Sequence, residues 1–338
     1  MLGQSVGPVF GGILTRFLGF RSIFWSLTIL GAIALFLILF FLPETLRSIA
    51  GNGTTRLTGI HKPFLYHLKP QPHVSSEPDP PQPRKRLTAR AFFDPVRFLF
   101  EKDVFITLLF GGIVYTVWSM ITSSTPSLFQ SLYHIDDLLL GLAFLPNGAG
   151  CVLGSYGAGL LMDFDYKRTV AEHRRAHAAL PDAEPSSSSS SPAPESFSIE
   201  RARLRSAPWF AAAFALAVAA YGFALGGGGI DRALVLQFAA SASAAALFAV
   251  NAALAIDLWP RAGASAAAAG NLVRCSFGAA GVAVVEPLVR ALSPRWAFVV
   301  LAGVAAAAGG LLWVEMRWGV GWRREREGRV AGREARGV

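Results

Sequence analysis

The chain has 338 residues, of which 53% are hydrophobic and only 16% are charged. Charged residues make up about 25% of an ordinary soluble domain, so this composition argues against a soluble protein, while 34 glycines and two cysteines exclude a collagen-like or disulfide-rich chain. The net charge of +9 would point to nucleic acid in a soluble protein, but in so apolar a chain its meaning depends on where the charges lie.

Apolar runs long enough to cross a membrane recur along the chain. A helix needs about 20 mostly apolar residues to cross the hydrocarbon core. The start of the chain has no basic segment, and glycine and proline break its first apolar run, so a cleaved signal peptide is a poor interpretation. We therefore expect the chain to begin inside a membrane segment. The sequence predicts one partial span, from Met1 to about Thr15, and seven full spans at 23–42, 104–125, 138–162, 207–225, 233–256, 266–291 and 295–316.

Two long polar stretches separate these spans. Residues 43–103 are rich in proline and contain the basic run 84–86, and residues 163–206 contain a run of six serines. Neither stretch can bury enough apolar surface to fold alone, so both are expected to be largely disordered. Aromatic and basic residues mix over 91–103, which predicts a short helix lying on the membrane surface. The basic run could instead be a nucleic-acid patch, but beside membrane spans a cytoplasmic loop is the simpler interpretation.

Lysine and arginine are distributed unevenly between the two sides of the predicted spans. One side holds 25 of them, in 43–103, in 163–206, at Arg261 and in the basic tail 317–338, and the other side holds 5. Because positive charges gather on the cytoplasmic side of membrane proteins, both long loops and the tail are expected to be cytoplasmic.

The first span carries small residues at a regular spacing. Glycines at this spacing clear one helix face so that a neighbouring helix can approach closely, and a proline bends the backbone. A generic packing face would look the same. The pattern also resembles the antiporter motif in the fifth helix of drug:proton antiporters of the major facilitator superfamily. The residues concerned are Gly3, Gly7, Pro8, Gly11 and Gly12.

Further segments resemble the same family, in the family's order. Residues 20–25 and 42–47 are similar to the entry into its sixth helix and the exit from it, and 251–275 resembles the fungal branch of multidrug, quinidine, polyamine and dityrosine exporters. The run that places Gly159, Asp163, Lys167 and Arg168 at a helix end resembles the loop motif that the family carries in its second half.

The resemblance implies an all-α integral membrane protein with the major facilitator transporter fold. Residues 1–42 would be the last two helices of the first bundle, and 104–316 would be a complete six-helix second bundle interrupted by the insertion 163–206. The chain departs from the family in that it starts in the fifth helix, so the first four helices have no counterpart in it.

Polar and aromatic residues share one face in two of the predicted spans. These substrate-path candidates are Tyr115, Trp118, Ser119 and Thr122 in one span and Gln237 and Ser241 in the other. Such a face predicts the wall of a substrate path. Interhelical hydrogen bonds that only hold the bundle together would give the same pattern, and the sequence leaves both interpretations open.

Charged residues within spans are costly and by default indicate function. Arg274 and Glu286 are therefore candidates for proton coupling or gating. They are twelve residues apart, which turns Glu286 about 120° away from Arg274 on a helix, so the two are not expected to pair. Glu286 could instead form an interfacial ion pair with Arg290, four residues on.

The resemblance implies that an intact relative exports small organic compounds or drugs by proton antiport, with the bilayer, a small-molecule substrate and the proton as partners. No cofactor, metal or nucleic acid is implied, and no catalytic motif indicates an enzyme. The plasma membrane is expected rather than the vacuole. The alternative is a truncated, non-transporting membrane protein or gene-model fragment, which would associate with another protein through an exposed bundle face.

Overall fold

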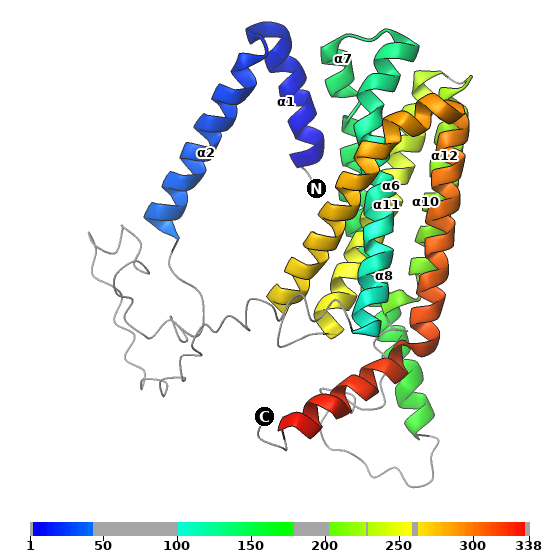
Figure 1. The fold of residues 1–338 in the computed structure, drawn as a ribbon. Coiled ribbons are helices and arrows are strands. Elements are labelled where there is room, and N and C mark those ends of the chain that lie inside the picture. The colour runs from blue at the N-terminus through cyan, green and yellow to red at the C-terminus, as the bar shows by residue number, and fades with distance from the viewer. Residues whose placement is uncertain (1–2, 43–100, 179–202, 228, 259–262, 335–338) are drawn as a thin grey trace. The chain divides into compact units, whose positions relative to one another are not determined.

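The computed structural model describes residues 3–42, 101–178, 203–227, 229–258 and 263–334, and all regular structure in these ranges is helical (Figure 1). The chain divides into two compact units, residues 1–12 with 92–338 and residues 13–91. Helix α1 (Gly3–Leu18) crosses the boundary between them, and α2 (Arg21–Phe41) belongs to the second unit. No residue of α2 is buried, which is typical of a helix that is apolar on all sides and faces lipid or other membrane helices.

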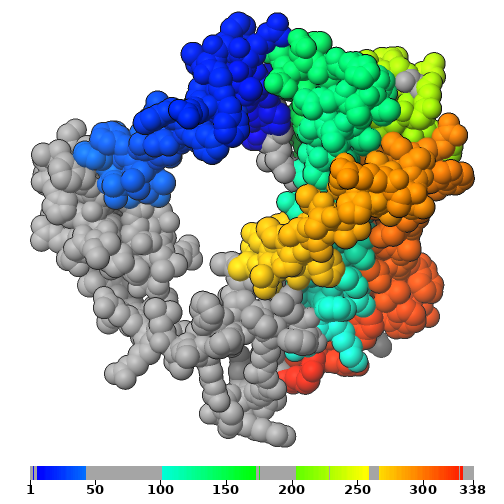
Figure 2. Space-filling model, turned by 45° about the horizontal axis from the view of Figure 1, so that its top comes forward, coloured from blue at the N-terminus to red at the C-terminus, as the bar shows by residue number. Residues whose placement is uncertain are grey.

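The larger unit is a bundle of helices that pack side by side. Helix α6 packs against α12, α8 against α11, and α10 against both α11 and α12. Figure 2 shows the two legs of α12, coloured yellow to red, on either side of α6 in cyan. The helices of the bundle are α6 (Lys102–Tyr133), α7 (Asp137–Leu142), α8 (Leu145–Ala178), α10 (Ala207–Leu225), α11 (Ile230–Leu258) and α12 (Gly263–Glu334).

Each predicted full span falls on helical structure, although the span 138–162 is divided between α7 and α8. Six helices in the described ranges are long and apolar enough to cross a membrane. The predicted spans 266–291 and 295–316 fall in one helix, α12, whose backbone leaves the helical region at Ser293 (φ 65°), directly before Pro294. The chain reverses there because a proline disfavours helical geometry in the residue before it, so the two legs of α12 act as separate spans.

The structure differs from the sequence-based prediction in the stretch 163–206. Helix α8 continues to Ala178 instead of ending near Met162, so the prediction of disorder is wrong for 163–178. The side chain of Asp165 is buried there, and Arg168 forms an ion pair of 3.2 Å with Glu172 one turn later, a spacing that stabilises an exposed helix. Residues 179–202 lie outside the described ranges, as does most of the predicted surface helix at 91–103.

Glycines allow α8 and α11 to approach closely. A Cβ atom on Gly150 or Gly154 would collide with the backbone of Phe238 or Ala242 in α11. Gly157, one turn after Gly154, has no atom within 4 Å of its Cβ position and takes no part in this contact. The predicted span 138–162 is interrupted between α7 and α8, and Pro146 lies in the first turn of α8, where a proline is tolerated.

Candidate substrate-binding site

The polar face predicted on α6 separates into two layers. The open layer consists of Tyr115 and Ser119, and the buried layer begins at Trp118. Tyr115 and Ser119 are partly exposed, whereas Trp118 is 2% exposed. Gly278, in the first leg of α12, lets the open layer form, because a Cβ atom there would lie only 2.8 Å from Cε1 of Tyr115 and 3.7 Å from Oγ of Ser119. The first leg of α12 therefore packs directly beside both side chains.

Arg274 lies one turn before Gly278 and extends over the open layer. Its guanidinium carbon is 5.9 Å from the centre of the Tyr115 ring, and its Nη2 donates a hydrogen bond to Oδ1 of Asn271. Its side chain is partly exposed, and among the residues that the structure describes no carboxylate forms an ion pair with it. It stands eleven residues after the start of α12, about 16 Å along the helix axis.

Aromatic rings connect this face to α11. The ring centres of Tyr115, Trp118 and Phe248 are each 5.9 Å from one another, and the Trp118 and Phe248 rings meet edge to face. Such contacts hold aromatic rings in a defined geometry. Tyr115 is thus held from behind by two buried rings, and its own ring supports the guanidinium of Arg274.

The buried layer is a hydrogen-bonded network between three helices. Trp118 Nε1 donates to Ser241 Oγ over 3.3 Å, and Ser241 Oγ donates to Oδ1 of Asn147 in α8. Gln237, one turn before Ser241, is 1% exposed. These residues lie inside the bundle, behind the open layer. Asn147 completes this network, although no pattern in the sequence indicated it as a site residue.

The remaining site candidates lie elsewhere. Thr122 donates a hydrogen bond of 2.8 Å to the Trp118 carbonyl of its own helix. Glu286 forms an ion pair of 3.3 Å with Arg290 and accepts a hydrogen bond of 3.4 Å from Ser127. The expectation that Arg274 and Glu286 do not pair is therefore confirmed, and the alternative pair of Glu286 with Arg290 is present.

The residues of the antiporter motif lie in α1, and those of the loop motif lie in α8. In the glycine-rich run of α1, a Cβ atom on Gly12 would lie 2.7 Å from the Asp137 carbonyl oxygen of α7, whereas Gly3, Gly7 and Gly11 have open space there. Pro8 is inside α1. The side chains of Asp163, Lys167 and Arg168 are exposed on α8, and the Cβ position of Gly159 is open.

Two features were not expected from the sequence. Glu315, in the second leg of α12, is 2% exposed and lines a small cavity with Thr107 and Asn251. A lone carboxylate in the predicted span 295–316 could have indicated it from the sequence.

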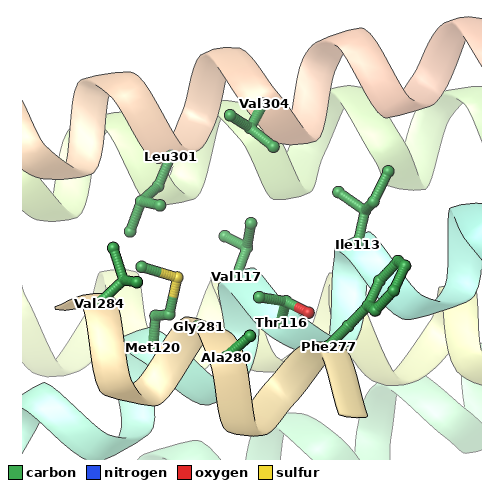
Figure 3. Close-up of a pocket in the computed structure, with 10 residues that line it drawn as sticks. All are labelled: Ile113, Thr116, Val117, Met120, Phe277, Ala280, Gly281, Val284, Leu301 and Val304. Carbon is green, nitrogen blue, oxygen red and sulfur yellow. The ribbon is translucent and has the colours of Figure 1, made fainter. Parts of the chain in front are cut away.

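A groove of about 420 Å³ lies between α6 and both legs of α12, and its lining is almost wholly apolar (Figure 3). The one hydroxyl of that lining, on Thr116, donates to Gly112 of its own helix over 2.8 Å. The groove therefore offers little to a charged substrate.

Known proteins with similar sequences are membrane transporters. Residues 1–172 match the model of the Major Facilitator Superfamily. The chain is 49% identical to "Citrate exporter 1" of Aspergillus niger over 330 residues, which is 98% of this chain and 62% of that protein. It is 28% identical to "MFS antiporter QDR2" of Candida albicans over 90% of this chain and 58% of that one, and 29% identical to "Multidrug transporter AQR1" of Candida glabrata over 98% and 55%.

These relatives are transporters and not enzymes, and the chain spans 62% or less of the length of each of the three. The family match covers just over half of the chain, and the helical bundle, with its apolar spans and the reversal at Ser293, fits that family's membrane transporter fold. The chain belongs to the Major Facilitator Superfamily.

Proposed function

We propose that this chain, as part of a two-bundle transporter, exports small organic compounds in exchange for protons. The observation that carries the proposal is the open layer of Tyr115 and Ser119 with Arg274 above it, well inside the span formed by α6. A polar and aromatic wall near the middle of the membrane is where secondary transporters bind their substrates. The names of the relatives, a citrate exporter and an antiporter, support export and exchange.

The two layers have different roles in this proposal. Tyr115 and Ser119 contact the substrate, and Thr122 continues their side of α6. Trp118, Gln237 and Ser241 support this wall from behind, because they are buried inside the bundle. Glu286 remains a candidate proton carrier near the end of the first leg of α12, where it forms an ion pair with Arg290. The basic tail faces the cytoplasm, and the protein resides in the plasma membrane.

The experiment is a transport assay on a complete two-bundle protein, made by joining this chain to the preceding region of the Aspergillus niger citrate exporter. We expect citrate to leave preloaded vesicles in exchange for protons that flow into them. Ser119→Leu should change the substrate profile while membrane abundance stays the same, because a wall residue contacts the substrate directly.

Ser123→Leu is the matched control, since Ser123 is an exposed serine one turn further along α6 and its hydroxyl bonds only to the Met120 carbonyl of its own helix. If both variants lose activity and abundance equally, the face of Ser119 serves packing and the proposed wall is wrong. A complete protein that reaches the membrane and moves neither citrate nor protons would favour the non-transporting alternative.

A further inference from the structure

We propose that Arg274, together with Asn271, Tyr115 and Ser119, forms a binding site for a carboxylate group, so that the exported compounds are small organic acids. This inference rests on the proposed function and names the substrate class of the same site. It assigns to Arg274 the binding of substrate rather than the coupling of protons.

The charge of Arg274 calls for a partner that the described residues do not supply. A guanidinium has five N–H donors and stays protonated at all physiological pH values, and one hydrogen bond, to Asn271, is made within the described ranges. A cation this far into a membrane span is costly unless an anion or water compensates it. Glu286, on the same leg of α12, is engaged with Arg290 and Ser127 instead.

The surroundings of Arg274 orient it for an anion. The Tyr115 ring lies against the guanidinium, with 5.9 Å between the guanidinium carbon and the ring centre, and Asn271 holds Nη2. A guanidinium fixed by an aromatic ring and one hydrogen bond keeps its other donors in a fork that matches the two oxygens of a carboxylate. Such a pair is stronger than a hydrogen bond between neutral groups.

The hydroxyl groups of Ser119 and Tyr115 complete the site. Oγ of Ser119 lies 3.7 Å from the Cβ position of Gly278, on the face that also holds the Tyr115 ring. Neither hydroxyl has a hydrogen-bond partner among the described residues, so both are available to a ligand. A compound that carries a hydroxyl beside its carboxylates, such as citrate, would use the arginine and the hydroxyls together.

The depth of the site argues for a soluble acid over a lipid headgroup. Arg274 is about 16 Å along the helix from the start of α12, whereas lipid phosphates lie at the membrane boundary, outside roughly 30 Å of hydrocarbon. The apolar groove of Figure 3 begins on the next turns of the same leg, at Phe277 and Ala280, and its one hydroxyl, on Thr116, already donates within its own helix. The anion must therefore enter from an aqueous path.

The test is ligand binding to the purified 338-residue chain and to the complete transporter, measured as the shift in the thermal unfolding midpoint. The probes are citrate, tricarballylate, glycerol and inorganic phosphate. Citrate and tricarballylate should raise the midpoint, and glycerol should not. Arg274→Gln should weaken citrate binding by about tenfold or more, because a charge-assisted bidentate pair is lost, and Arg274→Lys should retain part of the affinity.

Arg295→Gln is the matched control, because Arg295 is an exposed arginine on the second leg of α12 whose guanidinium lies over the Phe223 ring of α10, outside the proposed site. It should bind citrate like the unmodified protein. The inference is overturned if citrate shifts neither protein, if Arg274→Gln binds citrate unchanged, or if phosphate stabilises as strongly as citrate, which would indicate an adventitious ion only.

The transport assay separates this inference from the proposed function. If the complete transporter exports citrate and Arg274→Gln leaves its KM unchanged, the carboxylate site is wrong while export stands. If citrate binding depends on Arg274 but no flux occurs in the complete protein, the proposed export is wrong while the site stands.

Discussion

Oδ2 of Asp103, in the first turn of α6, lies 3.1 Å from Nη2 of Arg326 in the last part of α12, and the two side chains are only 1% and 5% exposed. The same Nη2 donates to the Leu258 carbonyl oxygen at the end of α11 over 3.2 Å. One arginine of the basic tail therefore connects three helices at the end of the bundle where the tail lies, a contact that no pattern in the sequence predicts.

This buried ion pair predicts an asymmetric response to mutation. Asp103→Asn or Arg326→Gln alone should lower the free energy of unfolding by about 3–5 kcal/mol, because each leaves one uncompensated buried charge. The double variant should lose less than the sum of the two single losses. Chemical denaturation in detergent measures all three.

The neighbouring pair of Glu101 and Arg329 is the control. Its 2.7 Å contact joins the same segments, but the Arg329 side chain is 61% exposed, and exposed pairs contribute about 0–1 kcal/mol. Removing it with Glu101→Gln should change stability little. Equal losses at the two pairs would contradict the role assigned to burial.

The contact between α8 and α11 gives a second prediction, with a control in the same helix. Gly154→Ala should destabilise the bundle by about 1–3 kcal/mol, because the added methyl group collides with the backbone at Ala242. Gly157→Ala should be neutral or slightly stabilising, since its Cβ position is open and alanine favours a helix over glycine by roughly 1 kcal/mol. Thermal unfolding midpoints compare the two, and the same shift in both would argue against this packing.

The helices were predictable from the sequence because crossing a membrane demands long apolar runs, and these are visible in the residues themselves. The extension of α8 to Ala178 was not, since that segment is polar and its contacts include an ion pair of Glu172 with Arg205, 33 residues away. Tertiary contacts of this kind leave no periodic pattern in the sequence.

The candidate site was predictable only in part. Helical spacing placed Tyr115, Ser119 and Trp118 near one another, but it could not tell which side would be open, because that depends on where α11 and α12 lie. Arg274 was recognised as costly within a span, yet its position over Tyr115 follows from Gly278, whose missing side chain is informative only once the two helices are seen together.

The proposed topology predicts protection of both basic segments in intact cells. Tags inserted at Ser188 and after Val338 should resist external protease until the membrane is opened, because the 25 lysines and arginines counted on their side favour the cytoplasm. A tag placed between α10 and α11, at Gly227, should be cleaved. Protection at Gly227 with cleavage at either of the other two positions would reverse the orientation.

The buried layer behind the site gives the last prediction. Ser241→Ala should lower the free energy of unfolding by about 1–3 kcal/mol, because it removes the partner of both Trp118 Nε1 and Asn147 and leaves buried polar groups unsatisfied. Ser243→Ala is its control two residues away, since that hydroxyl bonds only to the Ala239 carbonyl of its own helix over 2.9 Å. In the complete transporter, Ser241→Ala should reduce the amount of folded protein while the KM for citrate stays the same, because the side chain is 2% exposed and lies behind the wall. A changed KM with normal stability would instead place Ser241 in the substrate path, as its position on the predicted polar face also allowed.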